Sequence, residues 1–328
     1  MRIRVTVILI LCFNSVTMWG ETQEWKIVRQ DDFIRNDGIE GILQDVHFTN
    51  TKTGWAVGLG NLVLHTVDGG ETWLPLEIEL ERAIDFWNLY FYDENVGFIT
   101  GVGGTILKTT DGGVTWERMK WEVQEGVSGR RRLTDTWLVD GKMGFMVGEN
   151  NTLLRTSDGG ETWSGEGRGV AVGQTRNNLE RIFFGSPTHG WIVGSFGTLL
   201  HTSDGGVTWE PQDPGTDSNL HGVHFLDATT GWISGQEGFI AHTTDGGTTW
   251  TQQETDAYDN FYDIVFVDSS NGWAVGDYGA VAHTTDGGAT WMLGTAGSST
   301  TLWAVHAVDK NHCWAVGEWG LIVAYKSE

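Results

Sequence analysis

The chain has 328 residues and carries 43 acidic against 20 basic side chains, a formal net charge of −23 at pH 7. This balance excludes a typical nucleic-acid-binding protein, whose surface must be basic to neutralise phosphates. The 47 glycines and 18 tryptophans indicate many tight turns and many large apolar rings. After residue 20, no apolar stretch reaches the length of about 20 residues that a transmembrane helix needs.

The first 20 residues differ from the rest of the chain. Arg2 and Arg4 precede an apolar stretch over 5–13 and a short polar segment that ends near Gly20. This pattern predicts a secretory signal peptide over residues 1–20 and hence an exported protein. An uncleaved anchor is the alternative. A lipid anchor through Cys12 fits less well, because the preceding Leu11 is not small.

From residue 24 onward the chain is a repeat. The signature Thr-(Thr/Ser/Val)-Asp-Gly-Gly-x-Thr-Trp, an Asp-box, occurs six times, and its aspartates are 43, 47, 46, 41 and 41 residues apart. These intervals are typical of the blades of a β-propeller. The aspartates are Asp68, Asp111, Asp158, Asp204, Asp245 and Asp286.

One repeat shows how a blade is built. In the fifth, strands are predicted over 220–225, 231–235 and 239–243 and from Trp250 onward, with turn residues between them. Four strands make one propeller blade. A glycine-aromatic pair opens the second strand of six repeats, and Cys313-Trp314 marks a seventh, degenerate one.

The seventh repeat stops before any Asp-box, so it lacks its outer strand. Residues 24–28, Glu-Trp-Lys-Ile-Val, resemble the segment that follows each signature, and the N-terminus can therefore complete the last blade and close the ring. We predict an all-β, seven-bladed β-propeller with four-stranded blades over residues 21–328, and no second domain.

The Asp-boxes are interpreted as structural. An aspartate can accept hydrogen bonds from its own turn while the glycines take up positive φ. Six near-identical copies do not suit a catalytic carboxylate, which is needed once. A calcium loop would carry several alternating acidic ligands, which Asp-Gly-Gly does not provide.

Six arginines stand out against the acidic background. We predict that they form a basic patch on the face opposite the Asp-boxes, because they fall in the long connections between blades two and three and between blades three and four. Turns on the same face carry acidic and aromatic pairs in later blades, such as Asp277-Tyr278 and Glu318-Trp319. A face divided in this way suits a protein partner. The arginines are Arg130, Arg131, Arg132, Arg168, Arg176 and Arg181.

A local alternative to this patch is that Arg130–Arg132 pair with nearby acids such as Glu149 or Glu180.

Other kinds of functional site have little support in the sequence. His47, His224 and His306 come from three separate blades and show no metal-ligand spacing. No nucleophile elbow, phosphate-binding loop or dinucleotide fingerprint occurs in a suitable context. We therefore predict no catalytic residue, no cofactor and no metal.

Two families share the Asp-box. Sialidase-like glycoside hydrolases combine it with an arginine triad and a nucleophilic tyrosine, and this chain lacks their N-terminal Phe-Arg-Ile-Pro motif; the nearest segment is Phe33-Ile34-Arg35-Asn36. Over residues 24–328 the chain more closely resembles the photosystem II assembly and stability factors, which are exported seven-bladed propellers. The unit Gly-Trp-Ala-Val-Gly-x-x-Gly, followed by the Asp-box, carries this resemblance and is nearly intact over 54–73 and 272–291.

The resemblance implies a non-catalytic protein in the periplasm or the thylakoid lumen. We predict an exported monomer, with an extracellular location as the other possibility. Its partner would be a newly made membrane protein bound by the arginine patch, and a peripheral contact with the membrane would be compatible with that role. An Asp-box glycoside hydrolase and a cell-surface or periplasmic scaffold are the alternatives, since a fold does not fix a function.

Overall fold

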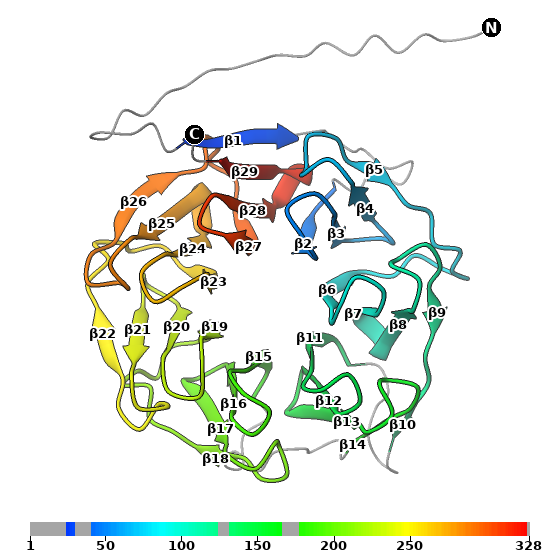
Figure 1. Cartoon of the computed structure of the whole chain (residues 1–328), viewed down its shortest axis with the longest axis horizontal. Coiled ribbons are helices and arrows are strands. Elements are labelled where there is room, and N and C mark those ends of the chain that lie inside the picture. The colour runs from blue at the N-terminus through cyan, green and yellow to red at the C-terminus, as the bar shows by residue number, and fades with distance from the viewer. Residues whose placement is uncertain (1–23, 30–40, 124–130, 166–176, 327–328) are drawn as a thin grey trace, which may run out of the picture.

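The computed structural model describes residues 24–29, 41–123, 131–165 and 177–326. Seven β-sheets are arranged radially around a central axis, each forming one blade (Figure 1). This arrangement confirms the predicted all-β, seven-bladed propeller. Among the described residues, no helix is long and apolar enough to cross a membrane. The helices within the described ranges are three short 3-10 turns, η1 (Val102–Gly104), η2 (Asp277–Gly279) and η3 (Glu318–Gly320).

Each blade contributes an inner strand to the central channel and a second and third strand behind it. The inner strands are β2 (Leu43–Phe48), β6 (Phe86–Phe91), β11 (Leu133–Leu138), β15 (Leu179–Phe184), β19 (Leu220–Phe225), β23 (Phe261–Phe266) and β27 (Leu302–Asp309). The second strands are β3 (Gly54–Gly58), β7 (Gly97–Gly101), β12 (Gly144–Gly148), β16 (Gly190–Gly194), β20 (Gly231–Gly235), β24 (Gly272–Gly276) and β28 (His312–Gly317). The third strands are β4 (Val63–Thr66), β8 (Thr105–Thr109), β13 (Thr152–Thr156), β17 (Thr198–Thr202), β21 (Ile240–Thr243), β25 (Ala280–Thr284) and β29 (Ile322–Lys326).

The outer strands are short and lie at the rim. They are β5 (Leu74–Pro75), β9 (Glu117–Arg118), β14 (Trp163–Gly165), β18 (Glu210–Pro211), β22 (Thr251–Gln253) and β26 (Met292–Thr295), with β1 (Glu24–Arg29) in the seventh blade. β1 pairs antiparallel with β29 from Glu24 opposite Lys326 onward. The N-terminal segment therefore completes the last blade, as predicted, and leaves the ring closed.

Blade three differs from the expected four strands. β10 (Trp121–Val123) comes from the long connection after blade two and pairs in parallel with the outer strand β14. This sheet therefore has five strands. The added residues of the connection supply a strand that covers the edge of the next blade.

The second strands form the blade cores. β3 and its counterparts in blades two to six are buried along their whole length, and in β28 only the first residue, His312, is partly exposed. In β3, glycine stands at both ends because the inner strand passes very close: a Cβ on Gly54 would lie 2.6 Å from the Phe48 ring, and one on Gly58 would lie 1.9 Å from the Ile42 carbonyl oxygen. The aromatic residue after the first glycine then points into the space between blades.

Neighbouring blades are joined through these aromatic residues. Trp314 of blade seven stacks on Phe48 of blade one with ring centroids 3.6 Å apart, and its indole N–H donates to the carbonyl oxygen of Gly69 in the Asp-box of blade one, at 3.1 Å. Trp191 and Trp232 repeat both contacts with the next blade. Truncating a fully buried tryptophan to alanine typically costs about 3–5 kcal/mol, so these contacts contribute strongly to ring stability.

Each Asp-box aspartate is bonded within its own turn. In the second copy, the carboxylate of Asp111 accepts from the backbone N–H of Thr115 at 2.9 Å, from its hydroxyl at 2.6 Å and from the hydroxyl of Thr109 at 2.8 Å. The other five copies repeat these bonds. The hydrogen bonds from threonine lower the pKa of Asp111 to about 2, so the carboxylates are ionised acceptors that shape the turn.

Candidate functional site: the loop face and the central channel

The two faces of the ring carry different connections. We call the face with the Asp-boxes the box face, and the opposite one, with the blade-to-blade connections and the turns between second and third strands, the loop face. On the loop face, the turns of blades one to six are bonded to the next connection. For example, the N–H of Asn61 donates to the carbonyl oxygen of Ile84, and the N–H of Gly104 donates to the carbonyl oxygen of Arg131, both at 2.7 Å. The connections and the turns therefore form one continuous surface.

The turns on the loop face contain an unusual set of aromatic residues. At the first left-handed position of each turn, blades one to three have Gly60, Gly103 and Asn150, the residue types that tolerate positive φ. Blades four, six and seven have large aromatic residues there, and blade five has a glutamate. They are Phe196 (φ 57°), Glu237 (φ 58°), Tyr278 (φ 54°) and Trp319 (φ 60°).

These aromatic side chains are exposed in spite of their strained backbone. Phe196 is 72% exposed, Tyr278 68% and Trp319 38%. A non-glycine residue in this conformation costs roughly 1–2 kcal/mol, and an exposed ring recovers little of that by packing. Tyr258, in the connection after blade five, is 91% exposed. With the acidic Glu237, Asp277 and Glu318 of the same turns, these residues form what we call the aromatic-acidic sector.

Two arginines of the predicted basic patch lie on the loop face. Arg131 donates to the carbonyl oxygen of Asn150 and to the hydroxyl of Thr152, both at 3.1 Å. Arg132 lies 4.0 Å from the centroid of the Trp87 ring and 3.4 Å from the Glu149 carboxylate. The predicted local pairing with Glu149 is therefore present. Arg130, Arg168 and Arg176 lie outside the described residues.

Arg181 does not lie where its sequence position predicted. It lies on the inner strand β15, not in a connection, and its side chain enters the central channel. There its guanidinium nitrogens are 3.3 Å from the Asp263 carboxylate, 3.7 Å from Asp45 and 3.9 Å from Asp135. The reason is strand alternation: Arg181 is the third residue of its strand, and third residues face the axis.

Third residues of the inner strands form a charged ring across the channel, which consists of Asp45, Asn88, Asp135, Arg181 and Asp263. The carboxylates join the blades, because Asp45 accepts from the N–H of Leu89 at 2.9 Å and Asp135 from that of Ile182 at 2.8 Å. Side-chain exposure within the ion-paired members is only 7–17%. The ring is thus a nearly buried network of three carboxylates and one guanidinium.

The electrostatics of the ring follow from burial. Burial raises the pKa of Asp45 to about 6 and that of Asp135 to about 7, while Arg181 partly opposes the shift. Burial likewise raises the pKa of Asp263. For Arg181, burial alone would lower the pKa, but Asp263, Asp45 and Asp135, together with the neighbouring Glu180, outweigh it, raise the pKa and keep the guanidinium charged. One cation therefore does not fully compensate three buried carboxylates.

Fifth residues of the inner strands form a second layer, which we call the aromatic collar. Its ring centroids follow one another at 5.9 Å (His47 to Tyr90), 5.5 Å (Tyr90 to Trp137), 4.3 Å (Trp137 to Phe183) and 4.6 Å (Phe183 to His224). His306 lies 4.5 Å from His47. The collar consists of His47, Tyr90, Trp137, Phe183, His224 and His306, with Val265 between the last two.

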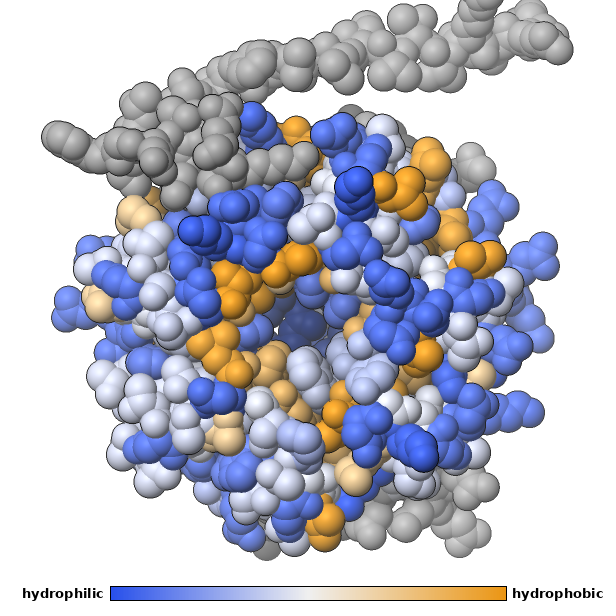
Figure 2. Space-filling view, in the orientation of Figure 1, coloured by the Kyte–Doolittle hydropathy of each residue, from blue (hydrophilic) through white to orange (hydrophobic). Residues whose placement is uncertain are grey.

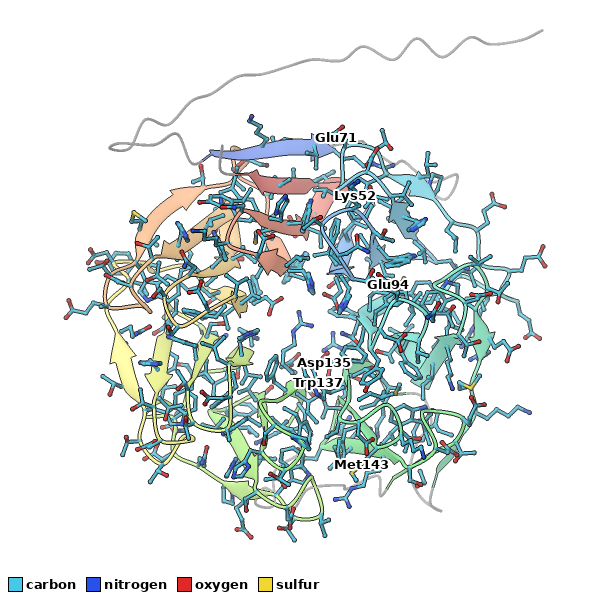
Figure 3. All side chains as sticks on the ribbon, viewed as in Figure 1. Lys52, Glu71, Glu94, Asp135, Trp137 and Met143 are labelled. Carbon is cyan, nitrogen blue, oxygen red and sulfur yellow. The ribbon has the colours of Figure 1, made fainter. Side chains whose placement is uncertain are left out.

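The charged ring and the collar enclose a pocket of about 570 Å³. It opens on the box face, because its lining continues past the inner strands to Tyr92, Val139 and Ser186, whereas the second residues of these strands are not part of it. Figure 2 shows this hollow at the centre of the molecule, with hydrophilic residues at its base. Figure 3 shows Asp135 and Trp137 beside the opening.

This pocket was not predicted from the sequence. The spacing of His47, His224 and His306 indicated no relation among them, whereas the collar brings His47 against His306. Among the described residues, no group of three or more histidine, cysteine or acidic side chains is placed to hold a metal ion. A signal was nevertheless present: aligning the inner strands of the repeats puts Asp, Asn, Asp, Arg, Gly, Asp and Ala at the third position, and five of these seven residues are polar.

Comparison with known proteins identifies the family. The family model described as photosynthesis system II assembly factor YCF48 matches residues 21–126, 120–210, 168–257 and 249–327. The chain belongs to this family. The resemblance inferred from the repeat unit is thereby confirmed.

A curated relative of the YCF48 family is the photosystem II assembly lipoprotein Ycf48 of Synechococcus sp. (strain RCC307). It is 49% identical over 49 residues, and the match spans 15% of this chain and 15% of the relative.

Solved structures share the fold. A structure titled YCF48 bound to D1 peptide superposes with a TM-score of 0.74 at 21% identity, covering 97% of this chain and 99% of that one. The structure of YCF48 from Cyanidioschyzon merolae superposes with a TM-score of 0.72 at 21% identity, covering 92% of this chain and 98% of that one. The GH74 xyloglucanase from Xanthomonas campestris gives 0.61 at 15% identity, with 93% of this chain and 54% of the enzyme covered. At these identities the likeness concerns the fold alone.

Proposed function

We propose that this YCF48-family chain is an exported, non-catalytic propeller that binds a polypeptide segment of a newly made photosystem II membrane protein on its loop face. Family membership supports the assembly role. The similar structure titled as bound to D1 peptide makes D1 the first partner to test. The curated relative is described as a lipoprotein, which is compatible with export.

The observation that carries the proposal is the placement of Phe196, Tyr278 and Trp319. Glycine or asparagine would fill these turn positions at less cost, as they do in blades one to three. Strained positions that persist without a packing reason tend to mark functional surfaces. Exposed aromatic rings are also the residues that most often anchor a protein interface.

The arginines extend this surface toward blade three. Arg131 and Arg132 lie in the connection that enters blade three, where Arg132 contacts Trp87, and we propose that a bound segment spans from them to the aromatic-acidic sector. We retain Arg130, Arg168 and Arg176 as contact candidates from the sequence. Arg181 is a weaker candidate, because its guanidinium is engaged by the carboxylates of the charged ring.

The test is binding to an array of overlapping peptides that cover D1. Three proteins are compared: the wild type, a loop-face variant with Phe196→Gly, Tyr278→Gly and Trp319→Gly, and a box-face control with Val67→Thr, Val114→Thr and Val207→Thr. The control valines are also highly exposed, and threonine occupies equivalent box positions in other copies, for example Thr110 and Thr248. Glycine suits the turn conformation, so the loop-face variant should fold.

We expect the wild type and the control to bind the same peptides, and the loop-face variant to bind at least about tenfold more weakly. Reversing charge at Arg131 and Arg132 to glutamate should weaken binding further and reduce its salt dependence. A loop-face variant that binds like the wild type, or a control that loses binding, would move the interface away from the loop face.

For the glycoside hydrolase alternative, the candidate carboxylates of the central pocket are those of the charged ring. All three are held by backbone N–H groups: Asp45 by Val46 and Leu89, Asp135 by Thr136 and Ile182, and Asp263 by Ile264 and Val305. These bonds favour a role in joining blades. Release of reducing sugar from xyloglucan or a sialylated substrate by the wild type, lost in Asp135→Asn, would support the enzyme instead.

Export is a further part of the proposal. Residues 1–20 lie outside the described residues, and the prediction of a signal peptide rests on their sequence. The intact mass of the mature protein tests it, because cleavage near Gly20, retention of the segment and lipidation at Cys12 give three different masses.

A further inference from the structure

The pocket on the box face has no part in the proposed loop-face function. Its base is the charged ring and its wall is the aromatic collar. The ring carries three carboxylates and one guanidinium, and only Asp263 lies within hydrogen-bond distance of Arg181, at 3.3 Å. Asp45 and Asp135 are farther away, at 3.7 and 3.9 Å. When all three are ionised, negative charge is left uncompensated at the base of the pocket.

Asn88 adds an acceptor that has no donor. Its amide nitrogen donates to Asp45 at 2.9 Å and to Asp135 at 2.8 Å. Those two bonds fix the amide orientation, because the reverse would place oxygen against two carboxylates. Within the described part of the chain its Oδ1 is buried without a hydrogen-bond partner, and the residue, which is 2% exposed, lines the pocket. A buried acceptor without a partner is costly, so the site favours a ligand that donates.

The collar adds a wall suited to a cation with an apolar stem. Tyr90, Trp137 and Phe183 present aromatic rings, which attract ammonium groups over their faces. Burial lowers the pKa of His224 to about 3 and that of His306 to about 4, and it lowers the pKa of His47 well below its usual value, with His306 adding to the shift. The three histidines therefore stay neutral near pH 7 and do not repel a cation.

We propose that this pocket binds a primary alkylammonium group, with the charge at Asp45, Asp135 and Asn88 and the methylene stem inside the aromatic collar. Two residues along a strand separate the ring from the collar, about 6.6 Å, a gap that a four-carbon stem can cross. The group could belong to a lysine side chain of a polypeptide or to a free amine, and the probes below distinguish these sources.

Binding should strengthen as pH rises. Between pH 5.5 and 8, Asp45 and Asp135 change from largely protonated to ionised, since their pKa values are about 6 and 7. The other groups facing the site do not change in the opposing sense: Arg181 stays charged, the collar histidines stay neutral, and the raised pKa of Tyr90 keeps its phenol protonated. Burial also raises the pKa values of Asp263 and, beside Arg181, of Glu180, and ionisation of either adds negative charge.

The experiment is calorimetric titration of the full chain with two probes, n-butylammonium and an N-acetylated pentapeptide amide with a central lysine. The same peptide with norleucine, which lacks the charge, is the control ligand. We expect the ammonium probe to bind at least about tenfold more tightly at pH 8 than at pH 5.5. The lysine peptide should bind while the norleucine peptide does not if a polypeptide can present the group.

Matched variants locate the site. Asp135→Asn should weaken binding at pH 8 by at least about tenfold, whereas Asp140→Asn, which removes one charge from an exposed turn of the same blade, should leave it within about twofold. Trp137→Leu keeps the charged ring and should weaken binding about three- to tenfold through the lost ring face. It serves as the second variant if Asp135→Asn does not fold.

Three results would overturn the inference. The norleucine peptide could bind as tightly as the lysine peptide, acetate could bind in place of butylammonium, or Asp140→Asn could weaken binding as much as Asp135→Asn. The first would make the pocket purely apolar, the second would make Arg181 its binding group, and the third would reduce the effect to net charge. None of them depends on whether D1 binds the loop face.

Discussion

The Asp-boxes and the third residues of the inner strands both place aspartates at repeated positions, yet the two sets behave in opposite ways. Asp111 and its equivalents are exposed, and each is bonded within its own turn. Asp45, Asp135 and Asp263 are nearly buried and are bonded across blades. The first set is almost invariant among repeats, whereas the second alternates with Asn, Arg, Gly and Ala.

The difference shows where a repeat protein can carry function. A position that is the same in every blade satisfies a need that every blade shares, such as closing a turn. A position that differs from blade to blade is not needed to fold each blade. The residues at such a position can therefore differ around the axis and together form a site. The turns on the loop face follow the same rule, with glycine or asparagine in three blades and exposed aromatic residues in three others.

The largest expected effect comes from removing the cation of the charged ring. Arg181→Met leaves three nearly buried carboxylates without a counter-charge, and such changes typically cost about 3–5 kcal/mol. The loss should be smaller at pH 5, where Asp45 and Asp135 are largely protonated. Urea denaturation at pH 5 and pH 8 measures both values, with Arg118→Met, on the exposed strand β9, as the control. Equal losses at the two pH values would contradict the ionic role of Arg181.

A second prediction compares the pH dependence of the two sets of aspartates. The pKa of Asp135 is about 7 in the folded protein, above its unfolded value of 3.8, so its contribution to stability is present below pH 4 and is lost as pH rises through 7. The free energy of unfolding of Asp135→Asn, relative to that of the wild type, should therefore be higher at pH 7.5 than at pH 4 by on the order of 2 kcal/mol.

The control for that comparison is Asp111→Asn. The pKa of Asp111 is lowered to about 2, so its contribution is present above pH 4 and is lost only as pH falls through 2. The difference in free energy of unfolding between Asp111→Asn and the wild type should be constant between pH 5 and pH 8. Denaturation curves at four pH values give both profiles, and parallel profiles would remove the distinction between the two sets.

The Asp-boxes should be interchangeable in their effect on stability. Asp111→Ala and Asp245→Ala each remove the same hydrogen bonds from an exposed turn, so each should lower Tm by about 2–4 °C, and by the same amount. Differential scanning fluorimetry is sufficient to measure this. A clear inequality between the two copies would show that at least one Asp-box has a role beyond its turn.

The smallest expected effect is a gain in stability. Tyr278→Gly relieves a left-handed backbone that costs roughly 1–2 kcal/mol, and the greater unfolded-state entropy of glycine offsets part of this. We expect a net gain of about 0.5–1 kcal/mol in urea denaturation. The matched change Asn150→Gly should gain less, since asparagine already tolerates this conformation. A loss of stability in Tyr278→Gly would mean that the ring packs structurally.

The sequence by itself determined the number of blades, their four-strand plan and the closure by residues 24–28, because each of these follows from local turn chemistry and alternation that recur in every repeat. The same local information identified the aromatic turn residues, though not their strained conformation. It also indicated the Asp-box as a turn, since all the donors to each aspartate lie within four residues of it.

Only the tertiary structure decided what meets at the axis. Arg181 was assigned from sequence to a connection, and only the inner-strand register turns it toward Asp45, Asp135 and Asp263, which come from three other blades. The collar likewise brings together His47 and His306, which are at opposite ends of the chain. Contacts across the ring depend on closure and on which residue of each strand faces inward, and no local pattern encodes their partners.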